Sequence, residues 1–542
     1  MKFNFLKNIP LPVPFVHVGI LYLMASLTSC GESINLEQSD KKVEETDITI
    51  TATLPQLNDV IQDFQEITWK ENASISIFDY IKNNNVFNSS QVTPSQTAVF
   101  SGKAIDSESY HAYYPYESSM AFKYSLIPFD IPMFQSQSVY GTIDMLGPLY
   151  ASFGNGETDI KFNTISTIVS FVMPQDCQGI RSVCIKDNGG VPITGSFNFN
   201  VKKQSCDITE SSVNKAVLFG PFESGKRYFV NVASVENLFK SGLSIEFNDN
   251  KAETSTVVFE TVEILQDKKY LDLGEIHFGD FAPKFSVEDL KLPGKKGVCA
   301  KTMMSKVVAQ KPYWNYTWKK EFYPDQPKNV EFIPMTWGGF NPNDVIPYIQ
   351  RLVDEGKISK VLAFNEPDTK DQSNMTVDRA IELWPYLEAL GIPIGSPSMA
   401  TSPTGKWMTD FMKRAKGLGY RIDFICVHDY TSACNVSNLK RKIDNTYNAY
   451  EKPILLTEFA IADRTTTTIE GNRWKPEQIL KYMKSALDYL ENADNVLGYA
   501  WFSLLLLLSP LLLSFLSSSF FASCKALSCA SAFTSRSAFS TF

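Results

Sequence analysis

Polar and aromatic residues close short apolar segments at a regular spacing in the C-terminal half of the chain. Trp337, Glu366, Pro397, His428 and Glu458 follow one another at intervals of 29, 31, 31 and 30 residues. One strand–helix–strand unit takes about 30 residues, so equivalent strand ends recur with that period. The spacing therefore predicts a parallel α/β sheet that brings these five side chains to one edge.

The segments around these positions alternate between strand-like and helix-like patterns. The predicted strands are 297–300, 312–318, 331–338, 360–368, 392–398, 422–430, 453–460 and 495–503. The predicted helices are 343–355, 376–390, 404–417, 437–450 and 475–492. Eight strands within residues 296–503 predict a compact (β/α)8, or TIM, barrel, with its active site at the carboxyl ends of the strands.

Residues 46–280 have a different, period-two pattern, as in 48–52 (ITITA) and 196–201 (SFNFNV). Such alternation is typical of half-buried strands, and we expect no long helix here. The length suits two β-sandwich subdomains. Residues 281–295 are rich in Pro, Gly and Lys and are predicted to be a linker. A chain of 542 residues also exceeds what one hydrophobic core supports, so a multidomain protein is expected.

The N-terminus has the pattern of a targeting signal. Lys2 and Lys7 precede an apolar stretch, and small residues lead into Cys30 (27–30, LTSC). This resembles a bacterial lipoprotein signal, which predicts a signal peptide over 1–29 and lipidation of Cys30. Residues 30–45 would then be a polar tether. We expect a protein held to a membrane by its lipid, at the outer membrane or cell surface.

The tail, residues 504–542, contains no acidic residue and is rich in Leu, Ser and Phe. Its uncharged stretch is long enough for a membrane span. Pro510 and the abrupt change in composition favour a frameshifted end instead, so the last helix of the barrel is predicted to be aberrant or missing.

Charge and cysteine content exclude other classes. The net charge of −8 argues against a nucleic-acid partner, which would need a basic face. The nine cysteines show no paired metal-type spacing, so we predict no metal site and no other cofactor. An extracytoplasmic location would permit disulfides without establishing any.

Two carboxylates at strand ends suit glycoside hydrolysis. Glu366 closes the fourth predicted strand and Glu458 the seventh, so both should face the same edge. In a retaining enzyme one carboxyl group protonates the leaving oxygen while the other attacks the anomeric carbon. The alternative is that Glu366 is a surface turn residue and Glu458 belongs to a helix cap.

Motifs around these residues resemble glycoside hydrolase family 128, the alkali-sensitive-linkage-protein-like group of clan A. The matching segments are 314–318 (WNYTW), 334–338 (PMTWG), 364–368 (FNEPD), 395–397 (GSP), 427–430 (VHDY), 456–460 (LTEFA) and 499–502 (YAWF). The resemblance spans residues 296–503 and implies a barrel that hydrolyses β-1,3-glucans. It also implies that Glu366 is the acid/base and Glu458 the nucleophile.

The same resemblance implies five substrate-binding residues. Asn365 would bind the sugar 2-hydroxyl, His428 and Tyr430 would line the floor near Glu458, and Trp337 and Trp501 would stack on sugar rings. The alternatives are a structural hydrogen bond for His428, core packing for the two Trp residues and a turn role for Asn365. Asp429 departs from the pattern, because an aromatic residue is expected there; the departure puts one sugar subsite in doubt.

The N-terminal half resembles the fimbrillin family of Bacteroidetes surface proteins. The matching segments are 67–69 (ITW), 76–78 (SIF), 100–102 (FSG) and 110–116 (YHAYYPY). The resemblance covers about 230 residues and implies sandwich domains used in surface display or adhesion. We expect His111 and the neighbouring tyrosines to be core and turn residues, not a catalytic group.

The sequence thus predicts a surface-anchored retaining glycoside hydrolase of β-glucan, most simply an endo-β-1,3-glucanase. The alternative is a non-catalytic glycan-binding or fimbrial adhesin lipoprotein with a degenerate barrel. The exact linkage, the chain length of the substrate, endo versus exo action and the oligomeric state stay open.

Overall fold

The computed structural model describes residues 44–61, 65–138, 141–300, 304–463, 465 and 471–502. The described residues from Glu45 onward belong to one compact unit. The protein is β-rich with few helices, and every α-helix among the described residues begins at or after Met304. The predicted signal peptide, Cys30 and the tail beyond 503 lie outside the described residues.

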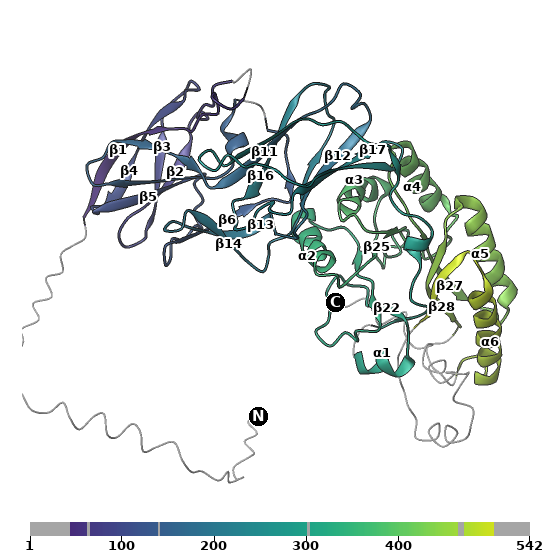
Figure 1. Cartoon of the computed structure of the whole chain (residues 1–542). Helices are drawn as coiled ribbons and strands as arrows, with labels where there is room; N and C mark the ends of the chain where they lie inside the picture. Colours follow the sequence, from purple (N-terminus) through teal and green to yellow (C-terminus); the bar gives the residue numbers. More distant parts are fainter. Residues whose placement is uncertain are drawn as a thin grey trace, which may run out of the picture. The chain divides into compact units, whose positions relative to one another are not determined.

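An eight-stranded sheet forms the first part of the all-β region (Figure 1), in the order β10–β8–β5–β2–β3–β4–β1–β9. Its strands are β1 (Glu45–Thr53), β2 (Ser74–Phe78), β3 (Asn84–Ser89), β4 (Thr97–Ile105), β5 (Ser109–Tyr114), β8 (Leu149–Gly154), β9 (Asp159–Lys161) and β10 (Asn163–Thr164). The two edge strands, β9 and β10, are separated in sequence by Phe162 alone. The sheet is therefore a nearly closed barrel, whereas the sequence predicted a β-sandwich. Curling brings the two edges together and protects them from pairing with other chains.

Two further sheets share one apolar core. Their strands are β16 (Arg227–Ala233), β11 (Ser166–Val172) and β19 (Tyr270–Glu275) in one, and β20 (Ala282–Pro283), β18 (Glu253–Phe259), β17 (Leu243–Asp249), β12 (Ile180–Asp187), β15 (Ala216–Phe219) and β7 (Phe134–Gln135) in the other. β17 shows the predicted alternation, because Leu243, Ile245 and Phe247 are buried and the residues between them are partly exposed. Facing sheets with a common core are the sandwich arrangement expected from the sequence.

Among the described residues, the all-β region also contains a smaller sheet and one short 3-10 helix, and a second 3-10 helix lies in the predicted linker. The sheet contains β14 (Ser205–Ile208), β13 (Gly195–Asn200) and β6 (Leu126–Ile131), and the 3-10 helices are η1 (Ile143–Leu146) and η2 (Glu288–Leu290). His111 contacts the hydroxyl of Tyr150 through Nδ1 at 2.7 Å, and burial lowers its pKa to about 4. These contacts fit the structural role expected for His111.

The strands of the C-terminal part are parallel. They are β21 (Lys296–Cys299), β22 (Trp314–Tyr316), β23 (Glu331–Phe332), β24 (Met335–Trp337), β25 (Val361–Phe364), β26 (Ile394–Gly395), β27 (Ile425–Thr431), β28 (Ile454–Ile461) and β29 (Val496–Trp501). One sheet has the order β23–β22–β21–β29–β28–β27 and the other β24–β25–β26. β23 and β24 are segments of one predicted strand, interrupted at Ile333 and Pro334, and a bridge between Gly395 and Phe424 links β26 to the start of β27.

Among the described residues, six α-helices accompany these strands. They are α1 (Met304–Gln310), α2 (Pro342–Asp354), α3 (Val377–Glu388), α4 (Lys406–Gly417), α5 (Val436–Tyr450) and α6 (Pro476–Asn492). The five predicted helices agree with α2 to α6 within two residues at each end; α1 was not predicted. No helix lies in residues 317–330, between β22 and β23. The complete (β/α)8 alternation expected from the sequence is therefore not seen in the described residues.

Capping and amphipathic patterning explain where these helices begin and what they cover. Asn341, Thr376 and Asn435 each accept a hydrogen bond from a backbone N–H in the first turn of α2, α3 and α5. Figure 1 shows α5 and α6 beside β27 and β28, where their apolar faces pack. We call the apolar residues between strands and helices the outer cluster; it includes Leu456, Phe459 and Tyr482.

A second apolar group is made of strand and strand-flanking residues only. This inner cluster comprises Cys299, Trp314, Tyr316, Ile333, Met335, Leu362, Phe424, Cys426, Leu455 and Ala500, with Trp318 and Phe502 packed against it. Residues of one strand thus divide between the two clusters: Leu455 is inner and Leu456 is outer. The division shows which side chains face the space that the strands surround.

The all-β region contacts helix α3. Arg181 donates two hydrogen bonds to the carboxylate of Glu388, at 2.9 and 3.2 Å, and lies 5.1 Å from the ring centroid of Tyr420. Lys215 donates a hydrogen bond to the carbonyl of Ala389 at 2.5 Å, and burial lowers its pKa to about 7. These contacts connect the end of α3 to β12 and to the residue before β15 in the six-stranded sheet.

No disulfide is formed among the described residues. The six cysteines among them are free: Cys177, Cys184, Cys206, Cys299, Cys426 and Cys434. In the same part of the chain, no helix is both long and apolar enough to cross a membrane.

Candidate active site

Glu366, His428 and Glu458 meet at the carboxyl ends of β25, β27 and β28. His428 and Glu458 are register partners in the parallel pair β27–β28, and Glu366 is the second residue after the end of β25. All three are buried, with exposed fractions of 5%, 3% and 4%. One carboxylate oxygen of each Glu and a ring nitrogen of His428 lie within 4.8 Å of one another. The structure thus brings together the two carboxylates that the strand spacing singled out.

A bulge in β28 turns Glu458 inward. The register of β27 and β28 shifts between Val427 and His428, and the register of β28 and β29 shifts between Leu456 and Phe459. Leu455 belongs to the inner cluster, so regular alternation would place residue 458 on the outer side. The extra residue changes this parity, and Glu458 faces the same space as His428.

His428 lies between the two carboxylates. Its Nδ1 is 3.0 Å from Oε1 of Glu366, and its Nε2 is 3.4 Å from Oε1 of Glu458, where the geometry falls short of a hydrogen bond. Burial disfavours the charged imidazole, but the nearby Glu458 and Glu366 carboxylates outweigh burial and raise the pKa of His428. A protonated His428 would neutralise part of the negative charge of the pair.

Glu458 is held by three hydrogen-bond donors. Tyr316 and the indole nitrogen of Trp318 donate to Oε1 at 3.0 and 2.7 Å, and Tyr430 donates to Oε2. Burial and then the charge of Glu458 raise the pKa of both phenols well above the usual range, so both stay protonated donors. The predicted proximity of Tyr430 to Glu458 is present in the structure.

Tyr316 and Trp318 belong to the motif at 314–318 (WNYTW), but the sequence predicted no role for them at the site. Their signal is the period of two in segment 314–318, where Trp314, Tyr316 and Trp318 share one face of a strand. Trp314 and Tyr316 both lie in the inner cluster. Trp318 lies two residues beyond the end of β22, packs against the same cluster and contacts Glu458.

Three neighbouring strand ends have left-handed backbone. Trp318 has φ 59°, Trp337 φ 63° and Glu366 φ 45°, at the ends of β22, β24 and β25. A non-glycine residue in this region costs of order 1 kcal/mol or more, and such residues cluster at functional sites. Trp337 is also 39% exposed, although it is a large apolar residue. Its backbone carbonyl accepts a hydrogen bond from the N–H of Asn365 at 2.7 Å, and an exposed indole at this strand end suits the predicted stacking on a sugar ring.

Asn365 is buried next to Glu366. Its Nδ2 donates to Oε1 of Gln372 at 3.3 Å, and its Oδ1 has no hydrogen-bond partner among the described residues. Buried amide oxygens are usually paired, so an unpaired one is suited to a substrate hydroxyl. This fits the predicted role of Asn365.

Trp501 lies away from the carboxylates. Its ring contacts Phe459 at 4.9 Å and Tyr482 at 6.5 Å between centroids, with the outer cluster. The next residue, Phe502, instead contacts Trp318 at 5.9 Å and Tyr430 at 5.2 Å. These contacts do not support the predicted stacking of Trp501 on a sugar, which stays a prediction, because the alternation of β29 turns Phe502 to the inner side.

Asp429 also faces away from the site. Its Oδ1 pairs with Nζ of Lys442 on α5 at 2.7 Å, and the same Nζ donates to the backbone carbonyl of His428 at 3.1 Å. Asp429, the departure from the family motif, therefore holds the lysine that hydrogen-bonds to the backbone of His428. It does not remove an aromatic residue from a sugar subsite.

The same three residues, Glu366, His428 and Glu458, are also a group with metal-ligand atoms. Carboxylate and imidazole ligands suit zinc. Here, however, each ring nitrogen of His428 faces a different carboxylate, and one ion binds only one nitrogen of a ring. The arrangement fits a bridging, protonated imidazole better than a metal ligand.

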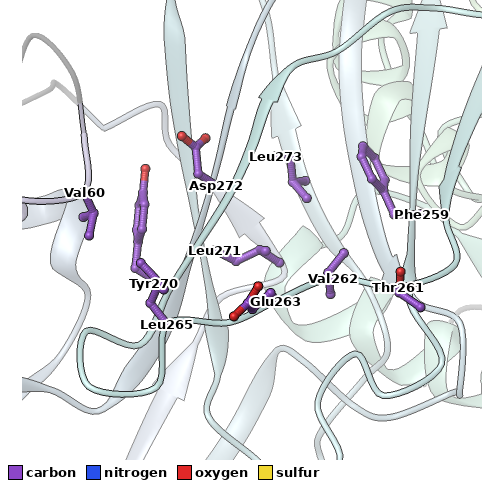
Figure 2. A pocket seen from close by; sticks show the side chains of 10 residues that line it. All are labelled: Val60, Phe259, Thr261, Val262, Glu263, Leu265, Tyr270, Leu271, Asp272 and Leu273. Atoms are coloured by element: carbon purple, nitrogen blue, oxygen red, sulfur yellow. The ribbon is translucent and has the colours of Figure 1, made fainter.

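A pocket of about 400 Å³ lies elsewhere, in the all-β region (Figure 2), between β19 and the segment that precedes it. Leu265, Leu271 and Leu273 are among its lining residues. Its Asp272 accepts hydrogen bonds from Arg227 and Ser170. The lining mixes apolar side chains with the acidic Glu263 and Asp272, and the carboxylate of Asp272 is already paired with Arg227.

A protein-family model covers the part of the chain that holds this site. Residues 298–510 match the family model described as glycosyl hydrolase catalytic core. No match was found among curated proteins.

Solved structures similar to this chain include three proteins assigned to glycoside hydrolase family 128. An endo-β-1,3-glucanase variant from Amycolatopsis mediterranei, in complex with laminarihexaose, is 31% identical over 39% of this chain and 89% of its own, with a TM-score of 0.35. An endo-β-1,3-glucanase from Sorangium cellulosum is 28% identical over 39% and 86%, with a TM-score of 0.32. An oligosaccharide-binding protein from Trichoderma gamsii is 23% identical over 40% and 86%, with a TM-score of 0.33. By its match to the family model, the segment that holds Glu366, His428 and Glu458 is a glycosyl hydrolase catalytic core.

Proposed function

We propose that this protein is a retaining glycoside hydrolase of β-glucan, and specifically an endo-β-1,3-glucanase held at the cell surface by a lipid on Cys30. The observation that carries the reaction type is the separation of the carboxylates, which have oxygens within 4.8 Å of each other. Carboxyl groups in retaining enzymes lie about 5–5.5 Å apart, whereas inverting enzymes need about 6.5–9.5 Å.

The roles follow from the contacts of each carboxylate. Glu458, whose carboxylate is held by three hydrogen-bond donors, is the nucleophile and forms the glycosyl-enzyme bond. Glu366 protonates the leaving oxygen and then takes a proton from the attacking water. Asn365, Trp337 and Phe502 bind sugar. The fold that we propose for this part is a (β/α)8-type barrel, because its parallel pairings run from β21 to β29 and return to β21.

The choice of β-1,3-glucan as substrate is supported by the motifs in the sequence that resemble glycoside hydrolase family 128. The endo-β-1,3-glucanases named above belong to that family. The surface location is supported by the lipoprotein-like segment that ends at Cys30. The fimbrillin-like motifs support a display or adhesion role for the all-β region.

A reducing-sugar assay on laminarin, curdlan and cellulose tests the proposal. We expect release from laminarin and curdlan, and nuclear magnetic resonance of the first product should show the retained β anomer. Glu366→Gln and Glu458→Gln should each remove nearly all turnover while the folded protein is kept. Azide should restore turnover to Glu458→Ala and give an inverted product.

Two outcomes would reject it. Normal turnover by Glu458→Gln would exclude Glu458 as nucleophile. Binding of laminarin by the wild-type protein without any hydrolysis would instead support the non-catalytic adhesin.

A further inference from the structure

The two oxygens of the Glu458 carboxylate have different surroundings. Oε1 accepts hydrogen bonds from Tyr316 and Trp318 and lies 3.4 Å from Nε2 of His428. Oε2 accepts one from Tyr430. Two of the three donors thus point at Oε1, whereas among the described residues a single donor, Tyr430, points at Oε2.

We infer that Trp318 is a positioning residue which, with Tyr316, holds Oε1 of Glu458 and leaves Oε2 as the oxygen that bonds to the sugar. The inference rests on the proposed function and assigns to the indole N–H of Trp318 a role in the second half of the reaction. In the first step Oε2 forms a bond to the anomeric carbon while the bond between the anomeric carbon and the leaving oxygen breaks. The leaving oxygen takes the proton of Glu366.

In the second step the charge returns to Glu458. Water bonds to the anomeric carbon and gives a proton to Glu366, while the bond between Oε2 and the sugar breaks and its electron pair stays with the carboxylate. The Oε1 atom changes from an ester carbonyl oxygen to half of a carboxylate. Donors already aimed at Oε1 stabilise this developing charge without reorganisation.

The structure holds Trp318 in place for this task. Its backbone has φ 59°, a conformation that is unfavourable for a bulky residue and that persists only when its surroundings fix it. Its ring packs edge-on against Tyr316 at 5.2 Å and Phe502 at 5.9 Å between centroids. The indole donates at 2.7 Å, the shorter of the two hydrogen bonds to Oε1. An indole does not titrate, so its donor is present at every working pH.

Trp318→Phe tests the inference, because it removes the N–H and keeps an aromatic ring at the same strained position. The substrate is a 2,4-dinitrophenyl β-laminaritrioside, whose good leaving group makes the second step limiting. We expect kcat to fall about 10- to 100-fold, as for loss of a hydrogen bond to a charged group. KM should fall with it, because the covalent intermediate accumulates, and kcat/KM should change much less.

Mass spectrometry supplies a second readout. During turnover the Trp318→Phe protein should carry a trisaccharide on Glu458 at a higher fraction than the wild type. Trp318→His, which restores a ring N–H, should recover part of kcat. The matched control is Trp337→Phe at the neighbouring strand end, for which we expect a higher KM and no accumulated intermediate, because Trp337 is proposed to bind sugar.

The outcomes separate the inference from the proposed function. If Trp318→Phe raises KM and no intermediate accumulates, Trp318 is a sugar-binding or purely structural residue and the inference is wrong. An unchanged kcat overturns it equally. Absence of turnover by the wild-type protein, with no sugar ever bound to Glu458, would reject the proposed function itself.

Discussion

Replacement of His428 by Phe should destabilise the catalytic core most strongly at acid pH. The imidazole makes one hydrogen bond to Glu366, at 3.0 Å, and a 3.4 Å contact with Glu458, all within buried surroundings. Phe fills the same space and leaves both carboxylates without this charge partner. A hydrogen bond to a charged group contributes about 1.5–3 kcal/mol, and removal of one partner of a buried ion pair costs about 3–5 kcal/mol. With one full bond and one weaker contact, we expect a loss of about 3 kcal/mol.

The sign of the pH dependence follows from the raised pKa of His428. Burial lowers the pKa of His428, but the two carboxylates raise it by more than burial lowers it. The charge of Lys442 lowers the pKa by a smaller amount. A group whose pKa is raised by folding stabilises the protein fully below its unfolded value, which is 6.5 for imidazole, and loses that contribution as the pH rises through the folded value. The difference in unfolding free energy between wild type and His428→Phe should therefore be largest near pH 5 and shrink above about pH 6.5.

Guanidinium denaturation followed by tryptophan fluorescence measures this difference. Of the eight Trp residues only Trp69 precedes the catalytic core, so the signal reports the unfolding of that core. The control is Arg414→Met, which removes the ion pair with Asp378 between two helices and none of the hydrogen bonds or ion pairs of Glu366, His428 and Glu458. A difference that grows with pH would show that neutral imidazole holds the site and would refute the argument.

Three further predictions concern other parts of the chain. Phe502→Leu should raise KM several-fold in the laminarin assay, whereas Trp501→Phe should leave KM unchanged, because only Phe502 faces Trp318 and Tyr430; equal effects would contradict the inward placement of Phe502. Arg181→Ala should lower stability by about 2–3 kcal/mol in the same denaturation experiment, since it leaves the carboxylate of Glu388 without its partner; an unchanged midpoint would show that the contact is dispensable. Cys30→Ser should move the protein from the membrane to the soluble fraction, as judged by fractionation of cells; normal membrane retention would exclude the lipid anchor.

The carboxylates could be located from the sequence because strand ends in a parallel sheet converge. The 30-residue recurrence placed Glu366, His428 and Glu458 on one edge, and the structure brings their polar atoms within 4.8 Å. Helix limits were also predictable, because caps such as Asn341 and Thr376 mark the first turn. Periodicity and capping are local signals, and they determine where elements begin and end.

The direction of side chains was less predictable, because it depends on parity within a strand. Trp501 and Phe502 are adjacent aromatics, and nothing in their sequence shows which one faces inward. The structure answers this through Ala500, which belongs to the inner cluster and so turns Phe502 to the same side. The near closure of the first sheet was likewise hidden, because it depends on pairing between β1 and β9, which are about a hundred residues apart.

Departures from regular strand geometry are concentrated where the chemistry is proposed. A bulge near Thr457 reverses the parity of β28 and turns Glu458 inward, and left-handed residues at Trp318, Trp337 and Glu366 end three neighbouring strands. Regular strands would place side chains by alternation alone, and Glu458 would then lie in the outer cluster. Such deviations cost stability and persist only where the surrounding packing fixes them. Since each one redirects a side chain of the site, we conclude that the backbone at these strand ends is shaped by the requirements of the two carboxylates and their donors.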